Sequence, residues 1–472
     1  MYKSIQQFNE KGIANLENIF KKFMDDPTKF AEMIYGIKDE VLNFALNMIK
    51  EEFEDTDRVI RNASERKEKW DIVRTDSTTL FTSIGTIKFQ KTLFRNKRTG
   101  KSEYLLDKVL KLDKYTRITE DAVSAMLDEA CDSCYRKGGE VSSISAENLS
   151  KQTTMNKIKV LDFPVYHPKE AKKKVETLYI ECDEDHVSLQ HEEDGVKTAM
   201  PKLIYVHEGV DRTSKRHALK NPVYFTGLYE GSKRNDELWN EILDYIEKAY
   251  DFNEIKKIYI LGDGAAWIKA GINHIPNSKF AIDKYHLSKY IQSSVSHLYD
   301  SAEDAKDLIY EALREQSAEK LNDVYDRILV STEEADIAKV LKAKQYILNN
   351  WNGVMVQMDI SSSCSAEGHI SHILADRVSS RPLGWCKNDL DKVVRLRAYK
   401  KNNGDMLELV RYQKSKEKKV AGLEDFTFSF AEIYQNEKRQ RDELGIYYGL
   451  KTYTIPIGIS KMFSIKERIR GL

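Results

Sequence analysis

Several acidic residues follow short apolar runs, at positions where a buried strand would end. The run 258–261 is followed by Gly262-Asp263-Gly264, and the run 280–282 is followed by Asp283, with His286 three residues on. In open α/β sheets, ligands and catalytic groups gather in the crevice beyond the carboxyl ends of the strands. Taken alone, Asp263 is more typical of a residue that caps the following helix. The interpretation therefore depends on whether other acids converge on it.

Two further acids could complete such a site. Asp183 lies in the middle of a predicted strand over 178–189, and Glu367 would lie in the first turn of a helix capped by Ser365. Three carboxylates suit phosphodiester cleavage and joining, because two Mg²⁺ ions (or Mn²⁺) about 4 Å apart activate the nucleophile and neutralise the transition state. Hard divalent cations require oxygen ligands. The acids are too far apart in sequence to form a local metal loop, so the fold must bring them together.

The elements expected around these acids form an α/β pattern. Residues 178–189, 202–206 and 223–228 are predicted strands, followed by an amphipathic helix, a strand to Gly262, a helix and a strand to Ile282. This βββαβαβ order is that of a mixed-sheet, ribonuclease H-like fold. Its first and fourth strands are neighbours, which would place Asp183 beside Asp263. Asp185, two residues on along the same strand face, is the alternative first ligand.

The remaining regions flank or interrupt this core. No glycine occurs between Gly271 and Gly353, and the stretch predicts helices over 305–315, 320–330 and 333–350 that form an all-helical insertion. The predicted regions are a helical region (1–70), a β-hairpin and helix-turn-helix-like DNA-binding region (71–162), the catalytic core (175–290 and 356–400), the helical insertion (291–355) and a C-terminal tail (401–472).

A basic hairpin is predicted before the core. A strand over 80–94, a turn over 96–100 and a return over 104–106 carry six basic residues and no acid between Lys88 and Lys101. Such a hairpin can follow a phosphate backbone. It is equally typical of an edge strand protected by lysines. The candidate DNA contacts here are Arg95, Lys97 and Arg98.

A short helix over 150–159, capped by Ser150, is the second candidate DNA-binding element. Met155 and Ile158 would face inward, as in a helix-turn-helix recognition helix, although many solvated helices share this pattern. The side chains expected to be exposed for DNA contact are Lys151, Gln152, Asn156, Lys157 and Lys159.

Composition limits the class of protein. The 472 residues are enough for two to four domains, and 75 basic residues balance 75 acidic ones, so net charge gives no argument about nucleic acid. Five scattered cysteines favour a reducing compartment. No apolar run approaches the length needed to span a bilayer. We expect a cytoplasmic protein that does not contact membrane; the family resemblance given below implies that it is bacterial and nucleoid-associated.

Together, the motifs resemble those of a known family. Segments 179–187, 261–267 and 283–287, with 364–372 and 379–385, look like the ISLre-type bacterial insertion-sequence transposases, which are distant relatives of the Mutator-like DDE transposases. The resemblance covers nearly the whole chain. It implies a ribonuclease H-like catalytic core with a helical insertion before the last acid.

The resemblance also implies functional residues and partners. Asp183, Asp263 and Glu367 would be the DDE ligands of two Mg²⁺ or Mn²⁺ ions, and Asp283-x-x-His286 matches a signature whose histidine sits near the scissile phosphate. His369 and Arg381 lie in the matching C-terminal motifs. His369 and His372 would lie one helical turn apart, a spacing more typical of packing or phosphate contact than of zinc binding. The implied partners are double-stranded DNA, as transposon ends and target, and further copies of the chain in a paired-end complex.

Three functions fit this sequence. The first is an active transposase. The second is a DNA-binding relic or repressor that uses residues 72–160 and does not cut. The third is another ribonuclease H-like nuclease acting on branched DNA or on RNA.

Overall fold

The chain folds into two compact units, each described by itself. One contains residues 1–125, 140–148 and 418–472, and the other contains 126–139 and 149–417. We use a computed structural model that describes residues 3–168, 171–193, 195–211, 213, 218–360, 366–380 and 384–421. Within these ranges, the side chains of residues 65, 191–193, 196, 366–367 and 417–421 are not described.

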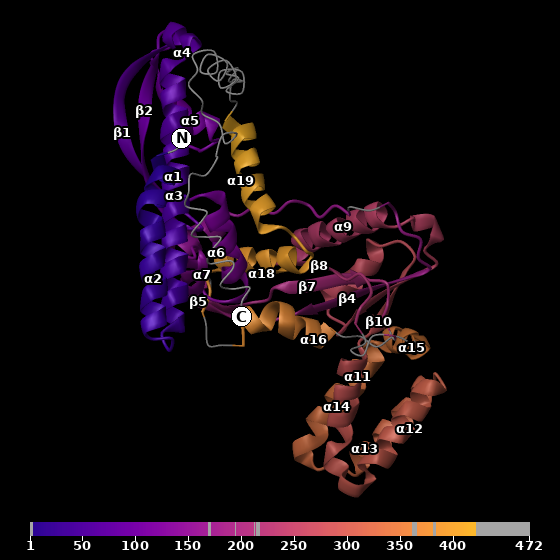
Figure 1. The fold of residues 1–472 in the computed structure, drawn as a ribbon. Helices are drawn as coiled ribbons and strands as arrows, with labels where there is room; N and C mark the ends of the chain where they lie inside the picture. The colour runs from indigo at the N-terminus through magenta and orange to yellow at the C-terminus, as the bar shows by residue number, and fades with distance from the viewer. Residues whose placement is uncertain are drawn as a thin grey trace. The chain divides into compact units, whose positions relative to one another are not determined.

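A five-stranded mixed sheet organises the larger unit (Figure 1). Its strand order is β10-β9-β4-β7-β8. The β4–β7 and β7–β8 pairs are antiparallel, whereas β9 runs parallel to β4 and β10 runs parallel to β9. Three strands therefore end at the same edge. The bounds are β4 (Thr177–Glu184), β7 (Lys202–His207), β8 (Val223–Gly227), β9 (Lys257–Gly262) and β10 (Ser278–Ile282).

The prediction of a single strand over 178–189 is wrong. The chain leaves β4 after Glu184 and starts a separate hairpin of β5 (Val187–Glu193) and β6 (Val196–Ala199). The apolar pattern continues across the break because Val187 is also fully buried, at the start of β5. Asp183 consequently lies near the end of its strand and not in the middle of it.

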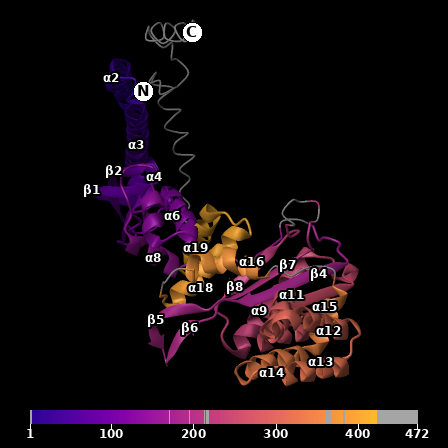
Figure 2. The same ribbon diagram turned by 90° about the horizontal axis from the view of Figure 1, so that it is seen from below.

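The two faces of the sheet are covered by different helices (Figures 1 and 2). Even-numbered residues of β4, such as Ile180 and Cys182, pack with Trp239 and Ile242 of α9 in one apolar core. Odd-numbered residues, including Asp183, face the other side, where α16 contacts β4 and α18 contacts β8. The helices of the larger unit outside the segment 284–359 include α8 (Lys151–Lys159), α9 (Gly231–Ala249), α10 (Ala266–Lys269), α16 (Ala366–Ile370), α17 (Asp376–Val378), α18 (Lys387–Lys401) and α19 (Met406–Ala421), with short turns η2 (Phe252–Glu254), η3 (Ala270–Asn273) and η5 (Ser371–Ala375).

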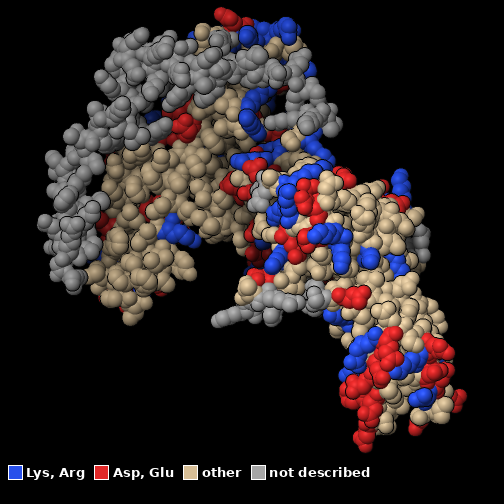
Figure 3. Space-filling view, turned by 90° about the vertical axis from the view of Figure 1, so that its right-hand side faces the viewer, with Lys and Arg blue, Asp and Glu red and all other residues tan. Residues whose placement is uncertain are grey.

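The segment predicted as a helical insertion is built of helices, and their apolar core also includes Ile282 of β10. Its three predicted helices agree with the observed ends to within three residues. Residues 301–350 carry more Asp and Glu than Lys and Arg, and acidic side chains are prominent on this lobe, the lowest part of Figure 3. The elements are α11 (Lys284–Val295), η4 (Ser296–Ser301), α12 (Ala302–Arg314), α13 (Ala318–Val330), α14 (Glu334–Asn349) and α15 (Trp351–Asp359).

The smaller unit combines helices with a three-stranded sheet of order β1-β2-β3. The predicted strand over 80–94 is two strands, because the chain reverses at Ser83 and Ile84 before Gly85, whose φ is +138°. The expected turn over 96–100 joins β2 to β3, but Leu105 and Leu106 begin a helix instead of extending the strand. The elements are α1 (Lys3–Gln7), η1 (Phe8–Gly12), α2 (Ile13–Asp25), α3 (Phe30–Asn62), α4 (Ser64–Lys69), β1 (Trp70–Thr82), β2 (Gly85–Asn96), β3 (Ser102–Tyr104) and α5 (Leu105–Val109).

Three described helices run across the division between the units, namely α6 (Glu120–Asp132), α7 (Tyr135–Val141) and α19, whose last residues belong to the smaller unit. Among the helices of the described residues, none has the length and apolar character needed to cross a membrane.

Candidate active site

Three acids lie side by side where three parallel strands end. Glu181 of β4 pairs with Leu261 of β9, so continuing this register by two residues sets Asp183 opposite Asp263. Ile282 of β10 pairs with Gly262, and the Asp283 amide donates to the Gly262 carbonyl at 2.9 Å. The sheet thus aligns Asp183, Asp263 and Asp283 along one edge.

Asp283 both caps a helix and orients a histidine. Its Oδ1 accepts a hydrogen bond from the Tyr285 amide at 2.8 Å, and its Oδ2 lies 3.0 Å from His286 Nδ1. Asp283 is buried, whereas the His286 side chain is 23% exposed. The hydrogen bond with Asp283 raises the pKa of His286, and the nearby charges of Asp183 and Asp263 act in the same direction. An imidazolium is therefore favoured beside the acids.

Asp183 lies in an environment that opposes its ionisation. Burial raises the pKa of Asp183 to about 6, and the charges of Asp263 and Asp283 add to this, whereas the Glu184 amide and His286 act against it. Asp185 lies elsewhere, because its Oδ2 accepts a hydrogen bond from Ser379 Oγ at 2.7 Å. Of the two candidate first ligands, Asp183 is thus the one within electrostatic reach of Asp263.

The Asp263 loop is held from two directions. Asp263 Oδ1 accepts from the Ala265 amide at 2.9 Å, as expected of a helix cap, and the Asp263 carbonyl accepts from Tyr346 Oη at 2.7 Å. Tyr346 comes from α14 of the helical insertion, and no sequence pattern singles it out. Its contact depends on how the insertion folds back onto the sheet, which local periodicity does not encode.

The third predicted ligand is only partly placed. Glu367 belongs to α16, but its side chain lies outside the described atoms, and Arg381 lies outside the described residues altogether. His369 in α16 packs against the sheet, with its ring 4.6 Å from Tyr205 and its Nδ1 3.1 Å from Tyr224 Oη. His372 is exposed and lies beside Asp376, so the two histidines do not face a common point.

The donor set at the strand ends has the chemistry of a hard-cation site. The acids supply oxygen ligands, and a cation would offset the burial and mutual repulsion that oppose ionisation of Asp183. Over the described ranges, no three His, Cys, Asp or Glu side chains are already arranged to hold a metal ion. A further carboxylate is needed, and Glu367 is the candidate whose helix contacts β4.

The candidate DNA-contacting residues of the short helix have mixed environments. Ser150 caps α8 as predicted, accepting from the Thr153 amide at 3.1 Å. The side chains of Lys151, Gln152, Asn156 and Lys157 are exposed. Lys159 differs from the expectation, because it is only partly exposed and lies 3.6 Å from Asp389 of α18.

The basic turn of the smaller unit presents three exposed cations. Arg95, Lys97 and Arg98 are all exposed, although Lys97 Nζ also donates to the Lys67 carbonyl at 2.7 Å. Lys91 of the same basic run is mostly buried in an ion pair with Asp107 at 2.6 Å. The run therefore contributes fewer free cations than its sequence indicates.

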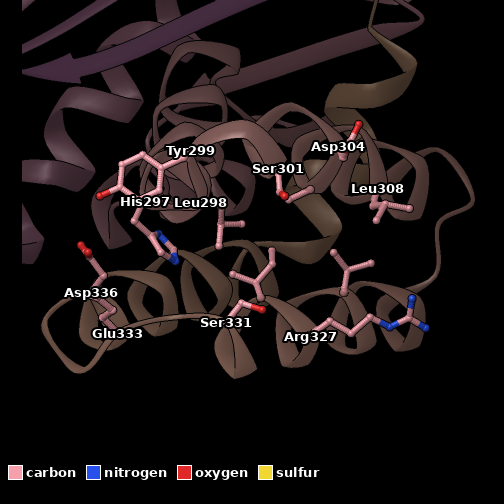
Figure 4. A pocket seen from close by; sticks show the side chains of 13 residues that line it. His297, Leu298, Tyr299, Ser301, Asp304, Leu308, Arg327, Ser331, Glu333 and Asp336 are labelled. Atoms are coloured by element: carbon pink, nitrogen blue, oxygen red, sulfur yellow. The ribbon is translucent and has the colours of Figure 1, made fainter.

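The helical insertion also contains a groove of about 470 Å³ (Figure 4). It is lined by apolar side chains such as Leu308, Val324 and Ile328 and by charged ones such as Asp304 and Arg327. None of the acids at the strand ends lines it. The groove is therefore separate from the candidate site.

Comparison with known proteins relates this chain to bacterial relatives. A protein of Caldanaerobacter subterraneus subsp. tengcongensis, named jointly by eleven UPF0236 gene designations, is 36% identical over 396 residues, which cover 83% of this chain and 82% of the relative. The UPF0236 protein in the vanSb 3′ region of Streptococcus gallolyticus is 24% identical over 351 residues, covering 71% and 74% respectively.

A structural comparison finds the Drosophila P element transposase strand transfer complex. The match has a TM-score of 0.25 and 11% identity, and it covers 65% of this chain and 83% of the other. A score this low does not define a shared fold. The family comparison is stronger, because the model described as "Uncharacterised protein family (UPF0236)" matches residues 23–416. On this match and on 36% identity over most of its length, the chain belongs to the UPF0236 family.

Proposed function

We propose that this protein is the DDE transposase of an insertion sequence, which binds terminal inverted repeats and catalyses DNA strand cleavage and strand transfer. The observation that carries the proposal is the row of Asp183, Asp263 and Asp283 at the ends of three adjacent parallel strands, with His286 beside them. Helix capping accounts for Asp263 and Asp283, but it accounts neither for Asp183 nor for the alignment of all three acids at one register. A two-metal mechanism of phosphoryl transfer, by contrast, uses clustered carboxylates to hold its metal ions.

The strand order supports a ribonuclease H-like core. Three antiparallel strands followed by two strands parallel to the first, in the order β10-β9-β4-β7-β8, match the βββαβαβ arrangement inferred from the sequence motifs. The name shared by eleven gene designations in one relative also supports the proposal, since an insertion sequence is expected to occur in many copies per genome.

In this proposal Asp183, Asp263 and Glu367 hold two Mg²⁺ or Mn²⁺ ions. When bound, the ions would activate the attacking oxygen and neutralise the leaving one. Neighbouring side chains would position and charge the groups that contact the DNA. Asp283 orients the His286 ring and favours its charged form, which can pair with a phosphate oxygen near the reacting bond. The exposed cations of α8 and of the β2–β3 turn would neutralise flanking backbone phosphates.

A strand-transfer assay with the native terminal repeats tests the proposal. We expect Asp183→Asn and Asp263→Asn to reduce Mg²⁺-dependent joining by about 1,000-fold or more, since each removes a charge that the transition state needs. DNA-end binding should be retained. The matched control is Asp185→Asn, two residues from Asp183, which should keep most of the activity because that carboxylate faces Ser379.

Two results would count against the proposal. Joining that persists in Asp263→Asn would exclude the metal mechanism. End binding by a wild-type protein that never cuts, with any divalent metal, would instead favour the repressor function.

A further inference from the structure

The helical insertion contacts the Asp263 loop through the end of α14. Tyr346 Oη donates to the Asp263 carbonyl at 2.7 Å, and Asn350 Nδ2 donates to the Tyr346 carbonyl at 2.8 Å. Asn350 also fills the space beside Gly264, where a Cβ would lie 2.6 Å from Asn350 Oδ1. One turn of the insertion therefore lies directly against the two residues at the centre of the candidate site.

The Tyr346 ring also contacts α11, the helix that Asp283 caps. It stacks on Tyr290 of α11, with ring centroids 3.8 Å apart and an interplanar angle of 18°. Tyr290 lies one helical turn after His286, and Asp283 caps the same helix. The hydroxyl of Tyr346 is thus aimed by a contact with the Asp283–His286 helix.

A second contact joins the insertion to the adjacent strand. Gly353 of α15 approaches β10 closely, because a Cβ at this position would lie 2.6 Å from the Phe280 ring and 3.4 Å from the Ile282 amide nitrogen. The acid-rich surface of the insertion is unsuited to a phosphate backbone. These observations favour mechanical support of the strand ends over DNA contact.

We propose that Tyr346 is a positioning residue that holds Asp263 in its working orientation, so that the helical insertion is a structural part of the active site. The proposal rests on the proposed function. Asp263 follows the last residue of β9. Tyr346 binds its backbone carbonyl, and among the contacts described its carboxylate accepts a hydrogen bond from the Ala265 amide. Loss of the Tyr346 hydrogen bond would let the loop rotate. Small displacements of a catalytic group cost large factors in rate.

The test compares Tyr346→Phe with Tyr325→Phe. The first keeps the ring that stacks on Tyr290 and removes only the hydroxyl. The control removes a hydroxyl buried in the same insertion, which lies 3.2 Å from Ser294 Oγ and does not touch the strand ends. We expect Tyr346→Phe to lower strand-transfer turnover at saturating DNA about tenfold with unchanged KM for the ends, because a net hydrogen bond contributes about this factor. Tyr325→Phe should change turnover by less than about twofold.

Hydrogen exchange in metal-free protein provides a readout independent of activity. The amides of residues 263–266 should exchange faster in Tyr346→Phe than in wild type or in Tyr325→Phe. Equal behaviour of the two variants would overturn the assignment, and so would faster exchange with unchanged turnover, which indicates a merely structural contact. If wild type itself performs no strand transfer, the proposed function fails, while the exchange comparison still decides whether Tyr346 holds the loop.

Discussion

Gly264, directly after the central acid, has no room for a side chain. Its φ is +94°, and a Cβ would lie 2.6 Å from Asn350 Oδ1, an atom that is buried. We expect Gly264→Ala to destabilise the protein by about 2–4 kcal/mol, because backbone strain and a collision with a packed side chain add. Urea unfolding measures this loss, and strand transfer should fall with it.

Gly231 is the matched control for Gly264. Its φ is +80°, but a Cβ there would meet nothing within 4 Å. Gly231→Ala should therefore cost only the strain of a left-handed residue, about 1 kcal/mol. Similar losses for the two substitutions would mean that Asn350 gives way freely and does not enclose the loop.

Among the secondary-structure elements of the smaller unit, a buried acid joins α3 to β2. Asp57 accepts hydrogen bonds from the Thr92 amide at 3.0 Å and from Thr92 Oγ1 at 2.5 Å, and burial raises its pKa. A raised folded-state pKa means that ionisation disfavours the fold, so stability is lost as pH rises through the ordinary value of 3.8 toward the folded value. We therefore expect the thermal unfolding midpoint of Asp57→Asn, relative to that of wild type, to increase as pH rises from about 4 to 7.

Asp121, in the same unit, should show the opposite dependence. Burial acts to raise the pKa of Asp121, but hydrogen bonds from Ser83 and Thr119 outweigh it, and the pKa is lowered. Its contribution is present above pH 3.8 and is lost as pH falls through the lower folded value. Asp121→Asn should therefore be less stable than wild type at pH 7, with the difference shrinking in acid. Parallel trends for both variants would contradict these electrostatic assignments.

At the scale of the whole molecule, exposed basic and acidic side chains are concentrated on different elements. Lys151 and Lys157 are exposed on α8, whereas the helical insertion is rich in acids. If α8 follows the DNA backbone, replacing both lysines with Ala should make the negative slope of log affinity against log salt shallower by about 1.8. Each phosphate contact contributes about 0.9 to the magnitude of this slope. Fluorescence anisotropy over a salt series with end DNA measures the slope.

The exposed Lys342 of the insertion provides the control for α8. Lys342→Ala removes one positive charge, against two in the α8 variant, from an acid-rich surface and should leave the slope unchanged. A change in slope for Lys342→Ala of about 0.9, half that of the α8 variant, would show that binding follows net charge and not a DNA contact made by α8.

The sequence alone predicted much of the element order. Apolar runs marked β4, β7, β8, β9 and β10, and helical periodicity marked the insertion, because both patterns arise from the burial of one face of each element. It misplaced boundaries where burial continues across a change of direction. Val187 is buried after the chain has already turned, and the turn before Gly85 lacks the usual signal residues at its centre.

For the candidate site, local sequence marked Asp263 and Asp283 as strand-end acids and Asp183 as an acid in an apolar run. Only the tertiary structure decided that Asp183 and not Asp185 faces the other acids, because that choice depends on where β4 ends and on the contact between Asp185 and Ser379. The sequence could not predict the hydrogen bond from Tyr346 to Asp263 either, because 83 residues separate the two partners. Periodicity reports which face of an element is buried, whereas register and long-range packing determine which atoms meet.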